Sequence, residues 1–510
     1  MKKILGIELG STRIKAVLID ENATVLAQGS YEWENILVDG LWSYPMNVVE
    51  EGLQASYADL IKNYGEALTY VDAIGISAMM HGYLAFDKGD KLLAPFRTWR
   101  NTNTAKAAEE LSKLFAFNVP MRWSVSQYYQ SVLDNLVHVK DIAYLTTLSG
   151  YVHYRLTGKK VLGIGDASGM FPVTDNSYDS EKIKKFNALL KEKGIDVNFE
   201  SILPEILLAG EDAGKLTSEG AAWLDKSGKL SAGIPCCAPE GDMGTGMIAT
   251  NCIAEKAANI SSGTSANLTV ILEKPLKNYY PEIDIIATPM GAPAALIHTN
   301  NCTSEINEWV NMFSEVAALC GADVNKGDLF TLLFKKSLES ESNVGKITAY
   351  NFLAGEPLGK TEKGLPMVAR TSDGNMNLAN FMQAQIYSAI ASVALGMDIL
   401  YSEGVSIDTV NAHGGFYKTE FVGQNATSAV LGAPVTVMEN AGEGGAWGMA
   451  VLALYLLNND KPLAQFLNDL FADAKKSTVT ATDTEKAKFA AFFEQYKKGL
   501  AAEKLASEVL

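Results

Sequence analysis

The sequence predicts an α/β protein built from two related halves. Two short stretches, Gly10-Ser11-Thr12 and Gly263-Thr264-Ser265, each place a glycine and two hydroxyl residues between two apolar β runs. Aligned on their glycines, these turns lie 263 − 10 = 253 residues apart in a chain of 510 residues. A chain of this length exceeds the size at which one hydrophobic core stops growing, and strand patterns alternate with helical ones along it. We therefore expect two domains, each opening with the same hairpin.

The first half begins with three expected strands, at residues 3–9, 15–19 and 24–31. Ser43 is a candidate N-cap for a helix with Pro45 in its first turn, and apolar residues continue at helical spacing to Ile61. A buried strand at 71–77 follows and ends at Met79-Met80-His81-Gly82. The alternation of strands and helices predicts a sheet whose strand ends could carry a site.

The second half repeats this order. Strands are expected at 258–260 and 268–272, a long helix at 378–401, and a strand at 409–412 that ends at His413-Gly414-Gly415. The segment 483–510 reads as a charged amphipathic helix or pair of helices. The junction of the halves is expected between 246 and 257, which predicts domains at 1–248 and 249–510.

Composition excludes several classes of function. The formal net charge is −16 and no dense Lys/Arg cluster is present, so nucleic acid and anionic membranes are not expected partners. The N-terminal apolar run is too short for a signal peptide and no apolar stretch reaches 18 residues, which predicts a cytoplasmic protein. The five cysteines and five histidines show no spacing of a zinc site, and the cysteines are expected to be buried thiols. The oligomeric state, a homodimer included, stays open.

The paired turns are candidate phosphate-binding elements. Glycine lets the backbone approach a phosphate, and the neighbouring N–H groups and hydroxyls can donate to its oxygens. Two such turns could grip a polyphosphate from both sides. The sequence contains neither a P-loop nor a dinucleotide fingerprint, so a nucleotide would bind between duplicated domains. Glu8 ends the first strand beside the first turn, where its carboxylate could hold a nucleotide-bound Mg²⁺ through water.

A second candidate site lies in the glycine-rich bend at 238–246, which contains two carboxylates, Glu240 and Asp242. Asp242 is flanked by glycine and is expected to be the better exposed of the two. An enzyme that transfers a phosphoryl group to an alcohol needs one carboxylate near the acceptor hydroxyl to orient it and take its proton. A carboxylate in a loop can equally be a plain turn former, so the bend alone leaves both interpretations open.

The order of these segments resembles the FGGY carbohydrate kinases, which have the actin-like ATPase fold, along essentially the whole chain. Xylulose kinases are the most similar subgroup because of the Met80-His81-Gly82 element. The matching positions are Gly6 to Thr12 with Lys15, Met80-His81-Gly82, Trp99-Arg100, Tyr154 to Gly158, Asp166 to Gly169, Gly241-Asp242, Ser262 to Ser265, and Gly414-Gly415 with Lys418, Gln424, Ala426, Gly432, Pro434 and Val435.

The resemblance implies two ribonuclease-H-like domains and a cleft that closes between them. It implies ATP- and Mg²⁺-dependent transfer of the γ-phosphoryl group to a primary hydroxyl of a sugar, with a ketopentose such as D-xylulose as the first choice. The implied roles are Asp242 as general base, Glu8 as the metal ligand through water, Gly10, Ser11, Thr12, Lys15, Gly263, Thr264 and Ser265 at the ATP phosphates, Gly414, Gly415 and Phe416 at adenosine, and Met80, His81, Trp99, Arg100 and Asp242 at the sugar.

The chain also departs from the family pattern. Glu8 replaces the usual Asp, Asn101 and Asn103 follow Trp99-Arg100 where an acid and a later arginine are common, and Met243 replaces a polar amide. The segment Arg122 to Ser126 fits the usual lysine-containing signature poorly. Ribulose, another ketose, a polyol or an aldonate therefore stay open as acceptors. A non-catalytic sugar- or nucleotide-binding regulator of the same fold is the alternative from another class.

Overall fold

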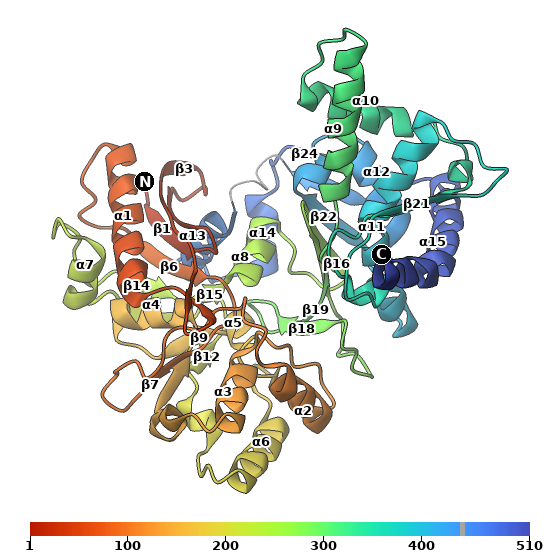
Figure 1. Ribbon diagram of the computed structural model, residues 1–510. Coiled ribbons are helices and arrows are strands. Elements are labelled where there is room, and N and C mark those ends of the chain that lie inside the picture. Colours follow the sequence, from red (N-terminus) through yellow and green to blue (C-terminus); the bar gives the residue numbers. More distant parts are fainter. Residues whose placement is uncertain (439–443) are drawn as a thin grey trace. The chain divides into compact units, whose positions relative to one another are not determined.

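The computed structural model describes residues 1–438 and 444–510, which divide into two compact units (Figure 1). The first unit comprises Met1–Ile253, Asn278–Ala294 and Glu443–Asp473. The second comprises Ala254–Lys277, Ala295–Gly442 and Ala474–Leu510. Two short segments from the second half of the sequence thus belong to the first unit. The division into domains at 248/249 stays a prediction.

The sheet of the first unit runs in the order β13-β14-β6-β1-β2-β3. β1 pairs antiparallel with β2 and parallel with β6, and the turn between β1 and β2 is the first predicted hairpin. The strands span Asp212–Lys215, Pro235–Cys237, Ala73–Ala78, Ile4–Leu9, Arg13–Ile19 and Val25–Glu32, in the same order.

The second seven-stranded sheet follows the same plan, in the order β24-β23-β22-β16-β17-β19-β18, in which β18 spans Asp284–Ala287. β16 pairs antiparallel with β17 and parallel with β22, and the second predicted hairpin joins β16 to β17. Beyond β6 and β22 the two sheets continue alike. β14 is parallel to β6 and β23 is parallel to β22, whereas the edge strands β13 and β24 are antiparallel to their neighbours β14 and β23. The duplication predicted from the two turns is confirmed strand by strand. The strands span Lys476–Val479, Val435–Met438, Thr409–His413, Ala257–Ser262, Ala266–Ile271 and Pro293–Thr299.

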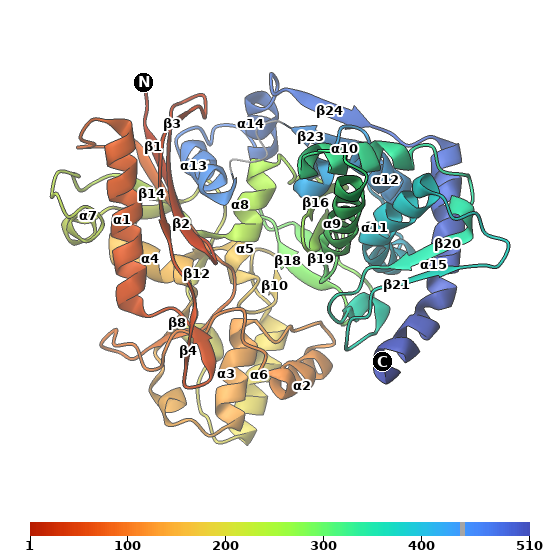
Figure 2. The same cartoon turned by 45° about the horizontal axis from the view of Figure 1, so that its top comes forward.

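Helices cover both faces of the first sheet. α1 (Met46–Tyr64) packs on β2 and β3, and α13 (Gly444–Leu456) packs on β1 and β6. In Figure 2, β1, β2 and β3 lie between α1 and α13. A second core of the same unit is rich in aromatic side chains and lies among three helices, α2 (Ala105–Phe115), α3 (Ser124–Leu133) and α6 (Ser180–Glu192).

The second unit is built around α11 (Leu378–Ser402), which is long and apolar enough to span a membrane by length and composition. Most of its residues are buried inside the unit, so its apolar character is that of a core helix. The C-terminal segment forms one helix, α15 (Asp483–Val509), and Thr482 caps it by accepting from the Glu485 N–H. The remaining helices of this unit are α9 (Ser304–Leu319), α10 (Lys326–Ser337) and α12 (Val422–Leu431).

Two expectations from the sequence need correction. Ser43 does not cap α1, because it is the buried last residue of β5 (Leu41–Ser43) and pairs with Ile36 of β4 (Ile36–Val38). Pro45 occupies the N-cap position in extended conformation, and no side chain caps the helix. The cysteines are all free, and four of them are buried as expected, but Cys320 is exposed at the end of α9.

Glycines bring helices into direct contact with the first sheet. A Cβ atom on Gly6 would lie 2.2 Å from the carbonyl oxygen of Ala446, and one on Gly75 would lie 2.8 Å from that of Met449. Gly6 and Gly75 are partners in adjacent strands, so they lie on the same face of the sheet, and the backbone of α13 packs against both. Real Cβ atoms do not come that close to backbone, so α13 can contact the strands only at glycines.

Two carboxyl groups are buried behind the loop that carries Asp242. Glu240, on β15 (Glu240–Gly241), is 2% exposed, and Asp166, in α5 (Ile164–Ala167), is fully buried. The hydroxyls of Thr147 and Ser149 donate to Asp166 Oδ2. Asp166 Oδ1 has no hydrogen-bond partner among the described residues.

Glycines also make room for the Glu240 side chain. A Cβ atom on Gly163 would lie 2.3 Å from Glu240 Oε2, and one on Gly165 would lie 2.2 Å from Oε1. Burial, with the charge of Asp166 acting in the same direction, raises the pKa of Glu240 to about 8. Burial likewise raises the pKa of Asp166 to about 7. Both pKa values are thus raised toward or above neutral pH, and protonation of Glu240 weakens the repulsion between the two groups in the core.

Gly6→Ala should destabilise the protein by about 1–3 kcal/mol or more, because the new methyl group meets the backbone of α13 and cannot be relieved by a side-chain rotation. Thermal unfolding of the purified variant measures this effect. Gly327→Ala is the matched control, since a Cβ there comes within 4 Å of a single atom, 3.4 Å away at the end of a side chain, and alanine favours the helix. Equal stability of Gly6→Ala and Gly327→Ala would contradict the assigned contact.

Glu240→Gln should change how stability depends on pH. The folded pKa of Glu240, about 8, exceeds its ordinary value of 4.5, so the unfolded state loses this proton first as the pH rises. Wild-type stability relative to the Gln variant therefore falls between pH 4.5 and 8, by as much as about 4 kcal/mol. Denaturant unfolding of both proteins at pH 5, 6.5 and 8 measures the difference. A difference that is constant with pH would show that Glu240 does not titrate in this way.

Candidate active site

Asp242 lies where two parallel strands end. β15 pairs with the end of β6, with Glu240 opposite Ser77 and Gly241 opposite Ala78. α8 (Asp242–Ala249) begins at the next residue, so the Asp242 carboxylate occupies the first turn of a helix. Helix N-termini favour negative charge. The carboxylate is partly exposed while Glu240 is buried, as expected from the sequence.

The end of β6 supplies a hydrogen bond to this carboxylate. The Met80 N–H donates to Asp242 Oδ1 over 3.1 Å. Gly241 is required here, because a Cβ atom would lie 2.2 Å from Met80 Cγ. Burial raises the pKa of Asp242, whereas the bond from Met80 and the charge of Arg122 lower it. The carboxylate is thus desolvated, while the donor and the cation both favour its ionised form.

Glu8 lies at the end of β1, opposite Lys15 of β2 and Ser77 of β6. The Ala446 N–H, in the first turn of α13, donates to Glu8 Oε2 over 3.1 Å. Burial raises the pKa of Glu8 to about 7, and the charge of Asp242 adds to the rise. The neighbouring carboxyl groups of Glu8 and Asp242 repel each other when both are ionised, so a divalent cation would be stabilised beside them.

The first hairpin turn is fixed by side chains around it. The Trp33 indole donates to the Gly10 carbonyl over 2.7 Å, and the Tyr44 hydroxyl donates to the Ser11 carbonyl. The Trp99 indole donates to Ser11 Oγ over 3.2 Å. These side-chain donors fix the conformation of the turn by binding its carbonyl groups. Ser11 is partly exposed and Thr12 is exposed.

Five residues are predicted to contact the sugar, and besides Asp242 itself two of them lie next to it. Met80 donates to it and His81 follows directly in the chain, with φ of +68°. Trp99 lies instead beside the first hairpin turn. The Arg100 guanidinium stacks 3.8 Å from the centre of the Trp42 ring and is exposed. The structure therefore groups Met80 and His81 with the candidate base, and Trp99 with the candidate phosphate turn.

The second hairpin turn is braced within the second unit. The Thr303 N–H and hydroxyl both donate to the Gly263 carbonyl, over 3.0 and 2.7 Å. Gly414, with φ of +106°, lies against the same strand, since a Cβ atom there would be 2.3 Å from the Ser262 carbonyl oxygen. The Phe416 side chain is fully buried in the core, so any contact with a nucleotide would come from its backbone. Thr264 and Ser265 complete the turn.

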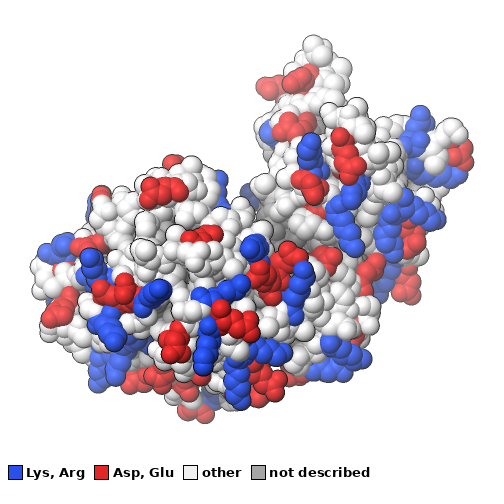
Figure 3. All heavy atoms as spheres, turned by 60° about the horizontal axis from the view of Figure 1, so that its bottom comes forward, with Lys and Arg blue, Asp and Glu red and all other residues white. Residues whose placement is uncertain are grey.

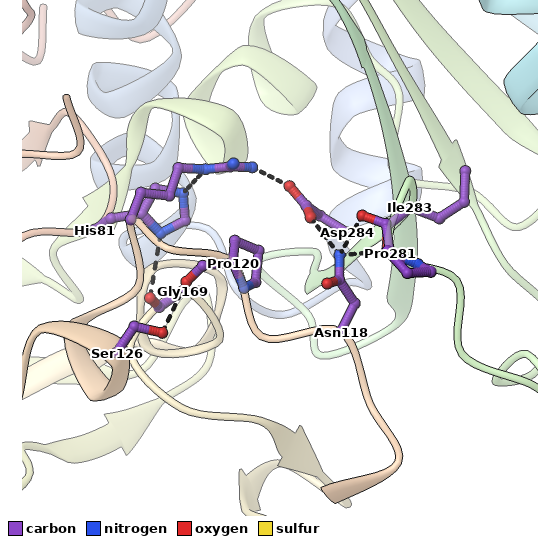
Figure 4. A network of polar contacts seen from close by, with 9 residues as sticks. His81, Asn118, Pro120, Ser126, Gly169, Pro281, Ile283 and Asp284 are labelled. Atoms are coloured by element: carbon purple, nitrogen blue, oxygen red, sulfur yellow. Dashed lines mark hydrogen bonds and ion pairs between the residues drawn. The ribbon is translucent and has the colours of Figure 1, made fainter. Parts of the chain in front are cut away.

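Sequence reasoning missed a polar network beside His81. Arg122 donates to the His81 ring and forms an ion pair with Asp284, and Asn118 donates to the same carboxylate (Figure 4). Asp284 is more than 160 residues from Arg122 and Asn118 in the chain, so no spacing pattern could reveal the pair. The only signal was that Arg122 departs from the lysine-containing family signature.

The distribution of charged side chains on the surface is in line with the absence of a dense Lys/Arg cluster from the sequence. The face drawn in Figure 3 shows Lys and Arg side chains interspersed with Asp and Glu. Among residues 1–438 and 444–510, no three or more His, Cys, Asp and Glu side chains are grouped so that they could hold a metal ion. A metal at Glu8 would therefore depend on water and on its ligand for most of its coordination.

Comparisons with known proteins identify the family of this chain. The model of the FGGY family of carbohydrate kinases, N-terminal domain, matches residues 3–249, and that of the C-terminal domain matches residues 258–457. A xylulose kinase of Haemophilus influenzae is 23% identical over 486 residues, covering 92% of this chain and 93% of that protein.

Solved structures share the fold. A gluconate kinase from Lactobacillus acidophilus superimposes with a TM-score of 0.80 at 18% identity and 99% coverage of both chains. A ligand-bound xylulose kinase from the same organism gives 0.79 at 17% identity, covering 99% of this chain and 100% of that one. The fold is the actin-like ATPase fold predicted from the sequence. With both family models matching and the two sheets duplicated, the chain belongs to the FGGY family of carbohydrate kinases and is an ATP-dependent sugar kinase.

Proposed function

We propose that this kinase phosphorylates a primary hydroxyl of a ketopentose such as D-xylulose, in the cytoplasm. The observation that carries the proposal is the carboxylate of Asp242, held at the strand ends by the N–H of Met80 in the Met80-His81-Gly82 element. Similar proteins named xylulose kinases, from Haemophilus influenzae and Escherichia coli, support the acceptor class.

Asp242 acts as the general base. Its carboxylate accepts the proton of the sugar hydroxyl as the oxygen attacks the γ-phosphorus of ATP, and the bond to the β-phosphate oxygen breaks to release ADP. The Met80 N–H occupies one carboxylate oxygen, Oδ1, which leaves Oδ2 to face the acceptor. Burial raises the pKa of Asp242 and makes its carboxylate a stronger base, while the Met80 donor and the charge of Arg122 favour the ionised form.

Mg²⁺ fits beside Glu8. Burial raises the pKa of this carboxyl group and the charge of Asp242 adds to the rise, so a cation beside it would favour its ionised form; the group also accepts one backbone N–H. No three-carboxylate cage exists among the described residues, which suits an ion that keeps its waters and binds phosphate oxygens. When bound, the ion supplies neutralisation of the phosphate charge. Glu8 would hold it through water.

ATP is bound by backbone groups at both hairpin turns. Gly10, Ser11, Thr12 and Lys15 contact the phosphates from the first unit, and Gly263, Thr264 and Ser265 contact them from the second. A Cβ on Gly263 would meet no atom within 4 Å, so the space above this glycine is open to a ligand. Gly414, Gly415 and the backbone of Phe416 contact adenosine.

Other acceptors remain alternatives, namely ribulose, another ketose, a polyol or an aldonate. One structural neighbour is a gluconate kinase, which favours keeping the aldonates among them. An assay of ADP release against ketopentoses, ketohexoses, polyols and aldonates decides between these acceptors. ATP binding without release of ADP for every compound would favour a non-catalytic regulator of the same fold.

Asp242→Ala should lower the rate of sugar phosphorylation at least about a hundredfold, because the attacking hydroxyl loses its base. Coupled ADP release measures the rate, while thermal unfolding and ATP binding should stay close to those of wild type. Asp90→Asn, which removes a carboxylate from the Lys160 ion pair elsewhere in the unit, is the control. Turnover retained by Asp242→Ala would rule out its role as base.

Gly263→Val should weaken ATP binding at least tenfold and leave the thermal unfolding temperature close to that of wild type. The added side chain would meet no protein atom at its Cβ but would occupy the space assigned to the phosphates. Gly414→Ala is the contrasting variant, because the added Cβ would lie 2.3 Å from the Ser262 carbonyl oxygen. We expect this substitution to destabilise the second unit. Calorimetric titration with ATP measures the affinity. Unchanged affinity in Gly263→Val would remove this turn from the site.

A further inference from the structure

Arg122 precedes α3 in the chain, and its guanidinium is held between two groups of the first unit, His81 and Asp284, which are labelled in Figure 4. Its Nε–H donates to His81 Nε2 over 3.2 Å, and one of its terminal nitrogens forms an ion pair with Asp284 Oδ2. The Arg122 side chain is 30% exposed and that of Asp284 is 13% exposed. The guanidinium is therefore fixed but still accessible from solvent.

The bonds to the His81 ring fix its tautomer. Nδ1 lies 3.2 Å from the Gly169 carbonyl oxygen, which can only accept, so Nδ1 carries the hydrogen. Nε2 then accepts from Arg122. Burial lowers the pKa of His81 to about 3, and the charge of Arg122 contributes, so the ring is neutral. Because both ring nitrogens are engaged inside the protein, the group that can reach a ligand here is the guanidinium beyond the ring.

Asp284 is itself held in place. It begins β18 (Asp284–Ala287), in the segment 278–294 that joins the first unit from the second half of the sequence. Asn118 Nδ2 lies 2.8 Å from Asp284 Oδ1, 3.0 Å from the Ile283 carbonyl and 3.2 Å from the Pro281 carbonyl. One carboxylate oxygen thus faces Asn118 and the other faces Arg122. The positive charge of Arg122 is therefore compensated by a carboxylate whose orientation is fixed by hydrogen bonds.

The same turn connects this pair to the candidate base. Met80 donates to Asp242 and the adjacent His81 accepts from Arg122, so consecutive residues hold the base and the guanidinium. The charge of Arg122 acts on Asp242 as well as on His81. Other charged or titratable groups around Asp242 are Glu8 on β1, Lys15 on β2, Asp166 in α5 and Glu240 on β15.

We propose that Arg122, held by His81 and compensated by Asp284, positions the acceptor and selects an uncharged sugar over a sugar acid. The proposal rests on the proposed function in one respect, that the acceptor binds beside Asp242. The described contacts use two of the five N–H groups of the guanidinium, which leaves donors for a sugar hydroxyl.

A carboxylate on the acceptor would gain little from this arrangement. The positive charge of Arg122 is already paired with Asp284, and the nearby Asp242 carboxylate would repel a further anion. A hydroxyl needs only a donor and bears no charge to be repelled. The pair therefore discriminates by electrostatics without closing the site to neutral acceptors.

Asp284→Asn tests the charge compensation. The substitution keeps the size of the side chain and an oxygen for Asn118, but leaves the charge of Arg122 unpaired. The readout is kcat/KM for D-gluconate relative to D-glucitol, which differ in a carboxylate and a hydroxymethyl group. We expect this ratio to rise at least tenfold in Asp284→Asn and to stay within twofold of wild type in the control Asp90→Asn. An unchanged ratio in Asp284→Asn, or a wild type that prefers gluconate to glucitol, would overturn the proposal.

Arg122→Met tests the positioning role. We expect KM for the best neutral acceptor to rise about tenfold, kcat to fall by less, and the use of gluconate not to increase. An unchanged KM would overturn the positioning role, as would equal gains for gluconate in Arg122→Met and Asp284→Asn. Thermal unfolding of each variant shows whether it is folded. Asn118→Ala removes a hydrogen bond to Asp284, so we expect it to raise the ratio of kcat/KM for gluconate to that for glucitol, but by less than Asp284→Asn does.

A second readout separates this proposal from the choice of acceptor. If the wild type phosphorylates no sugar, the proposed function fails, but gluconate can still be tested as a ligand. Stabilisation of Asp284→Asn by gluconate in thermal unfolding, with none for wild type or Arg122→Met, supports charge compensation. Equal stabilisation of all three proteins, or of none, would overturn it.

Discussion

Direct contact between α13 and the first sheet is the constraint on which the site depends. Gly6 and Gly75 lie side by side in β1 and β6, and the backbone of α13 rests on both. This contact places the first turn of the helix at the end of β1, where the Ala446 N–H meets the Glu8 carboxylate. A larger residue at either glycine would lift the helix from the strands and with it the donor to Glu8.

The candidate active site is a set of carboxyl groups with different environments. Asp242 has a backbone donor and a neighbouring cation, Glu8 has a donor and a neighbouring carboxylate, and Glu240 and Asp166 are enclosed behind them. Their pKa values are all raised by burial, yet Asp242 is the one with Arg122 to favour ionisation. Environment rather than residue type thus singles out the group that can act as base.

The sequence predicted the duplicated sheets because each half carries its own local signal, a glycine turn between two apolar strands. It singled out Asp242 as a candidate from the glycine-rich bend, whereas the role of Asp242 as base and the choice of Met80 came from the resemblance to the FGGY kinases, and both roles stay predictions. It failed at the cap of α1, where Ser43 pairs in a small hairpin instead. It could not reveal the Arg122–Asp284 pair or the packing of α13 on β1, because these contacts join residues far apart in the chain, and hydrophobic periodicity reports only which face is buried.

The discontinuity of the first unit bears on how the chain folds during synthesis. Its long N-terminal segment ends at Ile253, but the segment that contains α13 begins 443 − 253 = 190 residues later. At about 5–20 residues per second, the ribosome takes roughly 10–40 s to cover that interval. For that time the glycine-lined face of β1 and β6 has no helix on it and is open to other apolar chains. A nascent chain of this kinase therefore has a long period in which chaperone binding to that face would protect it from aggregation.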